Sequence, residues 1–197
     1  MNRRTWIIIG IVAVAAIVIY RSTIGPYNEM VKLNQDVKSQ WAQVENVYQR
    51  RADLIPNLVS TVKGYADFEK GTLTAVIEAR ASATQVKVNV DDLSPESIQK
   101  FQQAQGALSS ALGKLLVVSE QYPNLKANQN FLELQAQLEG TENRISVERN
   151  KFNDASQTFN TYILSFPNNL VAGMFGFKEK TYFTADEGAN KAPVVKF

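Results

Sequence analysis

The chain has 197 residues, 21 of them basic and 19 acidic, so its charges nearly balance and give no strong field to attract nucleic acid. It has no cysteine, which excludes disulfides, thiolate metal sites and thiol catalysis. It also has no histidine and so lacks the commonest general base and metal ligand.

An apolar run from Trp6 to Tyr20 is predicted to anchor the protein in a membrane. With its flanks, residues 5–24, the run has about 20 residues, or about 30 Å of helix, which is enough to cross the hydrocarbon core. Trp6 and Tyr20 lie at its ends, where amphipathic rings favour the headgroup layers. Because Arg3 and Arg4 precede the run, the positive-inside bias predicts a single crossing with a cytoplasmic N-terminus.

A cleaved signal peptide is the alternative, since it also has a basic start and an apolar middle. Residues 13–15 (Ala-Val-Ala) could serve as the cleavage site. The run continues beyond them to Tyr20, however, which is unfavourable at a cleavage site, and the absence of cysteine excludes a lipoprotein signal. Arg21, on the far side of the run, weakens the charge bias. We expect an uncleaved signal anchor.

The rest of the chain is predicted to form four helices, because its apolar residues recur at spacings of three and four. The helices cover about residues 27–63, 67–87, 95–122 and 128–166. Ser94 and Pro95 are a cap and a first-turn proline for the third helix. The apolar positions are Val37, Trp41, Val44, Tyr48, Ile55, Leu58, Val62, Leu73, Val76, Ile77, Val86, Ile98, Phe101, Leu108, Leu112, Leu115, Tyr122, Phe131, Leu134, Leu138, Ile145, Phe152, Phe159, Tyr162 and Phe166.

Short connections make neighbouring helices antiparallel. The predicted fold is therefore all-α: an N-terminal transmembrane helix followed by an elongated antiparallel four-helix bundle of coiled-coil-like helices. We assign residues 1–26 to a cytoplasmic stub and the anchor, 27–177 to the bundle, and 178–197 to an irregular tail.

The fourth helix returns towards the membrane, so the apolar stretch after it is expected near the bilayer. Leu170, Val171, Met174, Phe175 and Phe177 form a patch that is too apolar to leave in water. We predict a candidate interface with the membrane surface or a neighbouring subunit. In the alternative, the stretch folds back over the base of its own bundle.

Arg51 and Pro56 do not fit the pattern of the first helix. Arg51 occupies a seam position, so it either lies at the rim or is buried and needs a carboxylate. Antiparallel pairing with the fourth helix places it opposite Glu142, with Glu139 and Glu148 as alternatives one turn away. Pro56 removes the backbone hydrogen bond to the fourth residue before it and is predicted to kink the helix.

The first helix also carries small or apolar residues outside its seam, namely Ala42, Val47, Ala52 and Val59. The second and third helices are shorter than the first and fourth, so parts of the long helices lack cover within one chain. This pattern favours a homo-oligomer in the membrane, and the alternative is a monomer whose long helices cover one another.

No motif in the sequence indicates catalysis, a cofactor or a metal. Residues 106–114 (GALSSALGK) have six residues between their glycines, where a phosphate-binding loop has four. A di-iron bundle site needs Glu-x-x-His pairs, which a chain without histidine cannot supply. A Ser/Lys dyad needs neither Cys nor His, but none of the serines lies in a strained turn signature. We predict no enzyme activity.

Three long stretches resemble the bacterial LemA family. They are residues 49–65 (QRRADLIPNLVSTVKGY), 122–145 (YPNLKANQNFLELQAQLEGTENRI) and 152–177 (FNDASQTFNTYILSFPNNLVAGMFGF). The resemblance implies a helical bundle anchored in the bacterial inner membrane with its body outside the cytoplasm, and it supplies no catalytic residues.

We therefore expect a non-enzymatic, membrane-anchored scaffold or adaptor. Its expected partners are the lipid bilayer, copies of itself and an unidentified membrane or envelope protein, and not nucleic acid. The alternative is an accessory or sensor subunit that regulates a membrane enzyme such as a protease. A Ser/Lys-type hydrolase is the third hypothesis.

Overall fold

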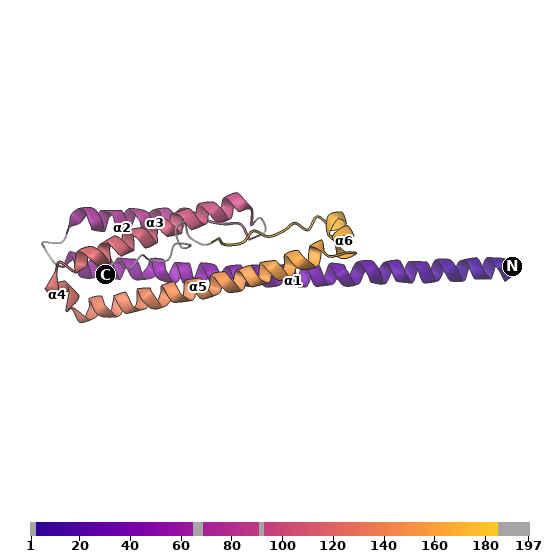
Figure 1. Cartoon of the computed structure of the whole chain (residues 1–197), viewed down its shortest axis with the longest axis horizontal. Coiled ribbons are helices and arrows are strands. Elements are labelled where there is room, and N and C mark those ends of the chain that lie inside the picture. The colour runs from indigo at the N-terminus through magenta and orange to yellow at the C-terminus, as the bar shows by residue number, and fades with distance from the viewer. Residues whose placement is uncertain (1–2, 65–68, 91–92, 185–197) are drawn as a thin grey trace, which may run out of the picture. The chain divides into compact units, whose positions relative to one another are not determined.

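The computed structural model describes residues 3–64, 69–90 and 93–184 (Figure 1). Within these ranges the chain is helical and has no strand, so the predicted all-α class is confirmed. The helices are α1 (Arg3–Lys63), α2 (Lys70–Gln85), α3 (Pro95–Ser119), α4 (Pro123–Lys126), α5 (Gln129–Leu164) and α6 (Asn168–Phe175). The predicted four helices correspond to α1, α2, α3 and α5, and the two short helices α4 and α6 were not foreseen.

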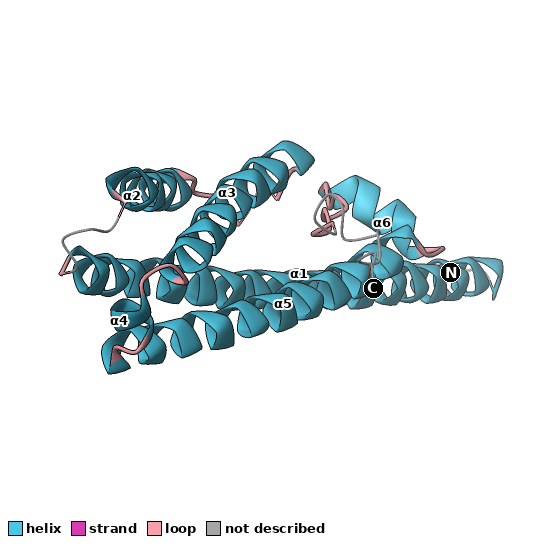
Figure 2. Ribbon diagram, turned by 60° about the vertical axis from the view of Figure 1, so that its left-hand side comes forward, coloured by secondary structure: helices cyan, strands magenta, loops and turns pink. Residues whose placement is uncertain are grey.

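Two compact units share the long helices α1 and α5. Unit 1 contains the chain up to Lys38 together with Asp154–Lys180, and unit 2 contains Ser39–Asn153 together with the described residues from Thr181. In unit 2, α2 and α3 lie side by side, and α4 is the single turn between α3 and α5 (Figure 2). The unit 2 portions of α1 and α5 run antiparallel, as predicted (Figure 1).

The core of unit 2 follows the predicted apolar seam. Trp41, Val44, Ile55 and Leu58 of α1 are each at most 1% exposed. Ser94 caps α3 as expected, because its Oγ accepts the Ser97 amide N–H at 3.4 Å, and Pro95 follows in the first turn. These local signals therefore place the long helices correctly, with shifts of up to three residues at their ends.

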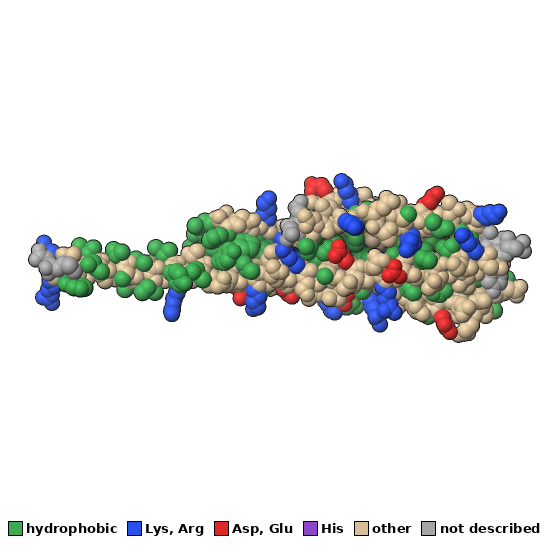
Figure 3. Space-filling view, turned by 180° about the vertical axis from the view of Figure 1, so that it is seen from behind, with side chains coloured by type: hydrophobic (Ala, Val, Ile, Leu, Met, Phe, Trp, Pro, Cys, Tyr) green, Lys and Arg blue, Asp and Glu red, His purple; other side chains and the backbone are tan. Residues whose placement is uncertain are grey.

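The apolar run near the start of the chain belongs to α1, which continues into the body without a break at residue 26. The most apolar 18-residue window of this helix has a mean hydropathy of 2.3, and none of it is buried. Among the described residues, α1 is the one helix long and apolar enough to cross a membrane. Figure 3 shows hydrophobic side chains along this otherwise uncovered part of α1.

Several packing predictions are wrong. Phe166 is 81% exposed, because α5 ends at Leu164 and its apolar stripe ends on the buried Ile163. Ile77 is 43% exposed and so lies outside the core. Ala52 and Val59, expected to lack cover within one chain, are buried inside unit 2.

Candidate functional site

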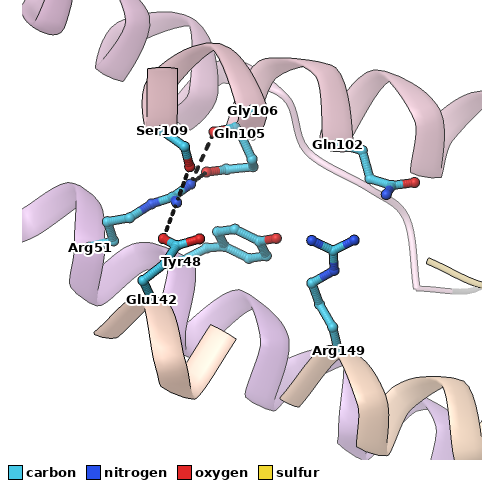
Figure 4. Close-up of a pocket in the computed structure, with 8 residues that line it drawn as sticks. All are labelled: Tyr48, Arg51, Gln102, Gln105, Gly106, Ser109, Glu142 and Arg149. Carbon is cyan, nitrogen blue, oxygen red and sulfur yellow. Dashed lines mark hydrogen bonds and ion pairs between the residues drawn. The ribbon is translucent and has the colours of Figure 1, made fainter. Parts of the chain in front are cut away.

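The most polar buried centre in unit 2 surrounds Arg51, whose side chain is 2% exposed (Figure 4). Its Nη1 donates to Glu142 Oε2 on α5 at 2.8 Å and to Ser109 Oγ on α3 at 2.8 Å. Its Nη2 donates to the side-chain Oε1 of Gln105 at 2.6 Å and to the backbone oxygen of the same residue at 3.3 Å. The guanidinium also lies 5.0 Å from the ring centroid of Tyr48. Arg51 therefore links α1 to both α3 and α5.

Of the predicted partners, the structure brings Glu142 to Arg51, and Arg51 is buried rather than at the rim. The Glu142 side chain itself is 56% exposed, so the carboxylate keeps much of its hydration while the guanidinium does not. Gln105, which the sequence did not single out, is the more deeply buried partner at 8% exposure. Its Nε2 donates in turn, at 3.3 Å, to the backbone oxygen of Ala83 on α2, the helix that packs against α3.

The pocket that Arg51 itself lines is small. It has a volume of about 20 Å³ and is lined by polar and aromatic side chains from α1, α3 and α5 (Figure 4). That space suits a water molecule and is far below the several hundred Å³ that an organic ligand occupies. Within the described ranges, no three acidic side chains gather as metal ligands do. The geometry therefore favours a structural role for the Arg51 centre.

Pro56 lies within α1, and the helix continues through it. Because proline lacks an amide hydrogen, the carbonyl of Ala52 cannot receive its usual helical hydrogen bond. Arg80 of α2 supplies a replacement, since its Nε donates to the oxygen of Ala52 at 2.7 Å. The proline thus creates a docking point for α2. The predicted kink stays a prediction.

An aromatic pocket in unit 2 was missed by the sequence analysis. Phe183, in the segment expected to be irregular, is 5% exposed and stacks on Trp41 with ring centroids 5.8 Å apart and an interplanar angle of 9°. Phe152 and Phe101 complete the cluster around the same ring. The guanidinium of Arg149 lies 5.1 Å from the centroid of Phe183. A segment without regular structure therefore contributes a core residue.

Side chains of α3 and α5 bind the backbone of this segment. The Asn153 amide pairs with Phe183 in both directions, donating to its oxygen at 3.0 Å and accepting from its nitrogen at 2.8 Å. Arg149 and Gln102 both donate to the oxygen of Thr184, at 2.7 and 3.0 Å. An asparagine beside an apolar stripe was the available signal for this contact, but the sequence does not show which backbone it meets.

Unit 1 contains a similar pairing. The Asn160 side chain donates to the oxygen of Lys180 at 2.8 Å and accepts from its nitrogen at 2.7 Å, and the Lys180 ammonium lies 5.4 Å from the ring centroid of Phe159. Nearby, burial raises the pKa of the Tyr162 phenol above its ordinary value, and the Glu29 carboxylate adds to the shift. Asn160 and Phe159 thus hold Lys180, in the segment that follows α6, against α5.

The predicted membrane-anchor residues all lie on the first part of α1. Trp6 and Tyr20 are 63% and 64% exposed, and Arg3 and Arg4 are exposed as well.

The predicted interface patch divides into two groups. Val171 is buried within unit 1, whereas Leu170, Met174 and Phe175 are exposed. Phe175 and Phe177 contact the ring of Tyr27 of α1, with centroids 4.7 and 5.9 Å away. One side of α6 therefore folds back on its own chain, and Leu170 and Met174 remain outside.

Comparison with known proteins decides the family. A sequence profile of the LemA family matches residues 40–197, about four fifths of the chain. The chain belongs to the LemA family. The match contains the Arg51 centre, the Phe183 pocket and α6, so these features lie in the part that defines LemA-family membership. The recognition made from the sequence is confirmed.

Curated relatives are similar over most of their length. The chain is 26% identical to the magnetosome protein MamQ 2 of Paramagnetospirillum magneticum, over 94% of this chain and 74% of that protein. It is 25% identical to the magnetosome protein MamQ of Magnetospirillum gryphiswaldense, over 86% of this chain and 68% of that one. It is also 24% identical to the protein LemA of Metamycoplasma hominis, over 86% and 74% of the two chains.

Proposed function

We propose that this LemA-family chain is a non-enzymatic, membrane-anchored scaffold or adaptor that binds partner proteins or copies of itself. The observation that carries the proposal is the continuity of α1, in which a wholly exposed apolar run and a packed amphipathic stretch share one helix. Such a helix ties the body directly to the bilayer. By the charge bias of Arg3 and Arg4, the N-terminus lies in the cytoplasm and the body lies outside it.

The buried polar groups support the non-enzymatic part of the proposal. All four hydrogen bonds of the Arg51 guanidinium go to groups of its own fold, and the pocket that Arg51 and Glu142 line holds little more than a water molecule. The MamQ relatives are named for a cellular structure, the magnetosome, rather than for a reaction, which agrees with a structural role.

The anchoring is tested by washing membranes that contain the full-length chain with alkaline carbonate. The wild-type chain should stay with the lipid. A double variant, Val12→Lys with Val14→Lys, should be released, because each charge at the centre of a spanning helix costs about 3 kcal/mol. Val117→Lys is the matched control: Val117 is 70% exposed on α3, outside the apolar run, so the chain with this substitution should stay with the membrane. Release of the wild-type chain would contradict the anchor.

The scaffold role is tested by extracting the full-length chain gently and measuring the mass and composition of what leaves the membrane. A defined assembly of copies, or a stoichiometric complex with a structural envelope protein, supports the scaffold. A stoichiometric membrane enzyme whose turnover changes when this chain is removed would instead establish the accessory-subunit alternative. Turnover of a substrate by the purified chain alone would overturn the non-enzymatic proposal.

A further inference from the structure

The helix α6 exposes large apolar side chains although it is docked on its own chain. Leu170 is 61% exposed and Met174 is 76% exposed, four residues apart on one side of the helix. Phe166, four residues before Leu170, is 81% exposed. Figure 3 shows hydrophobic side chains gathered at this end of unit 1, beside the uncovered apolar part of α1. The exposed stripe therefore has no cover within the described residues of unit 1.

The opposite side of α6 fixes its height on α1. Val171 and Ala172 are buried, and Phe175 packs against Tyr27 with ring centroids 4.7 Å apart. Tyr27 lies three residues beyond Ile24, the end of the expected crossing, or about 4.5 Å along the helix. The headgroup layer on each side of a bilayer is about 5–8 Å thick. The docking at Tyr27 thus places α6 at the level of the headgroups.

The composition of the segment suits that environment. Residues 163–177 contain no charged side chain, and the first charges after them are the exposed Lys178 and Glu179. A helix with an apolar stripe at this depth lowers its free energy by turning the stripe towards the acyl chains. A protein interface is the poorer fit, because a stable one buries about 800 Å² on each partner and this stripe is a few side chains wide.

We propose that α6 is a second membrane attachment, an interfacial helix whose Leu170 and Met174 enter the boundary between headgroups and acyl chains beside the anchor. The proposal rests on the anchoring of α1 proposed above and adds a lipid-binding surface to it. A single spanning helix can tilt and rotate about its own axis. A second attachment through α6, which packs on α1 at Tyr27, would limit both motions. The lipid surface would therefore set the orientation of unit 1 relative to the membrane.

Spin labelling of the full-length chain in lipid vesicles tests this directly, because the native sequence has no cysteine to interfere. Nitroxides are attached to Met174→Cys, Val12→Cys and Val117→Cys in separate samples. Val12 lies within the apolar run and Val117 is a similarly exposed apolar residue of α3, so they serve as references for lipid and for water. For each label, the collision rate with oxygen, which concentrates in lipid, is divided by that with a water-soluble nickel complex.

We expect the ratio at Met174 to be severalfold above that at Val117 and below that at the deeper Val12. A ratio at Met174 equal to that at Val117, with Val12 lipid-exposed, would overturn the interfacial helix and leave the anchor intact. A water-like ratio at Val12 as well would overturn the anchor and the proposed function with it. Spin–spin broadening at Met174 that disappears on dilution with unlabelled chain would show that a second copy covers the stripe, which also overturns the lipid assignment.

Discussion

Two of the partners of Arg51, Gln105 and Glu142, should contribute unequally to the free energy of unfolding, and the neutral one should contribute more. Double-mutant cycles with Arg51→Met, Gln105→Leu and Glu142→Gln measure the coupling of each partner to Arg51. We expect the neutral Gln105 to be coupled more strongly than the anionic Glu142, because burial removes competition from water at Gln105 and not at Glu142.

The magnitudes follow from exposure and distance. Arg51 is 2% and Gln105 is 8% exposed, and their side chains are 2.6 Å apart. A buried hydrogen bond to a charged group contributes about 2 kcal/mol, and removing the donor leaves a buried acceptor unsatisfied. Glu142 lies 2.8 Å away but is 56% exposed, so its coupling should be about 1 kcal/mol or less. That smaller coupling should decline further in salt, because screening acts on the exposed charge.

Urea unfolding of the full-length chain in mild detergent measures both couplings. Trp41 is fully buried in unit 2 and reports its unfolding by fluorescence, and a Trp6→Phe background removes the signal from the anchor. A coupling of Arg51 to Glu142 that equals or exceeds its coupling to Gln105, and that does not change with salt, would refute the reasoning. Plain additivity in both cycles would show that the Arg51 centre does not act as a unit.

Three further outcomes are expected. Arg80→Met should lower the free energy of unfolding by about 1–2 kcal/mol, because it leaves the carbonyl of Ala52 without a donor. The loss should be smaller in a Pro56→Ala background, where the restored amide of residue 56 donates to that carbonyl. Equal losses in the two backgrounds would contradict the role of Arg80 as the replacement donor. Phe183→Ala should cost about 3 kcal/mol and shift the emission of Trp41 to longer wavelength, whereas an unchanged spectrum would mean that the pocket is not occupied in solution. Protease added to intact spheroplasts should digest the body and spare an N-terminal tag, and a shortened, freely soluble mature protein would show a cleaved signal instead.

The parts of this fold that the sequence predicts are those set by local periodicity. Residues three and four apart on a helix share a face whatever the tertiary structure, so the seam through Trp41, Ile55 and Leu58 could be assigned before any partner was known. The Arg51–Glu142 contact could be predicted because two antiparallel helices have the same rise per residue. The number of residues from the shared end therefore gives the height of each side chain along the bundle. Both inferences need only the geometry of a helix.

The parts that were missed depend on which surfaces meet. Ala52 and Val59 look uncovered along α1, and only the docking of α2 through Arg80 shows that they are not. Phe183 belongs to no periodic segment, and its place beside Trp41 comes from backbone bonds to Asn153 that no spacing rule encodes. Phe166 continues the spacing of α5, but the helix ends two residues earlier, so the residue leaves the core.

Because α1 is unbroken from the anchor to Tyr27, the number of residues between Tyr20 and Tyr27 sets both the height of Tyr27 above the anchor and its direction around the helix axis. Each residue inserted there raises Tyr27, and the α6 helix packed on it, by about 1.5 Å and turns them by about 100° relative to the anchor. A fluid bilayer is the same in every direction around the anchor. The lipid contact of a membrane-bound α6 would therefore change gradually with its height and would not depend on its rotation. A protein neighbour, which occupies one direction, would be lost and regained with a period of about 3.6 residues. A series of insertions between Tyr20 and Tyr27 would therefore distinguish a lipid surface from a protein neighbour as the partner of α6.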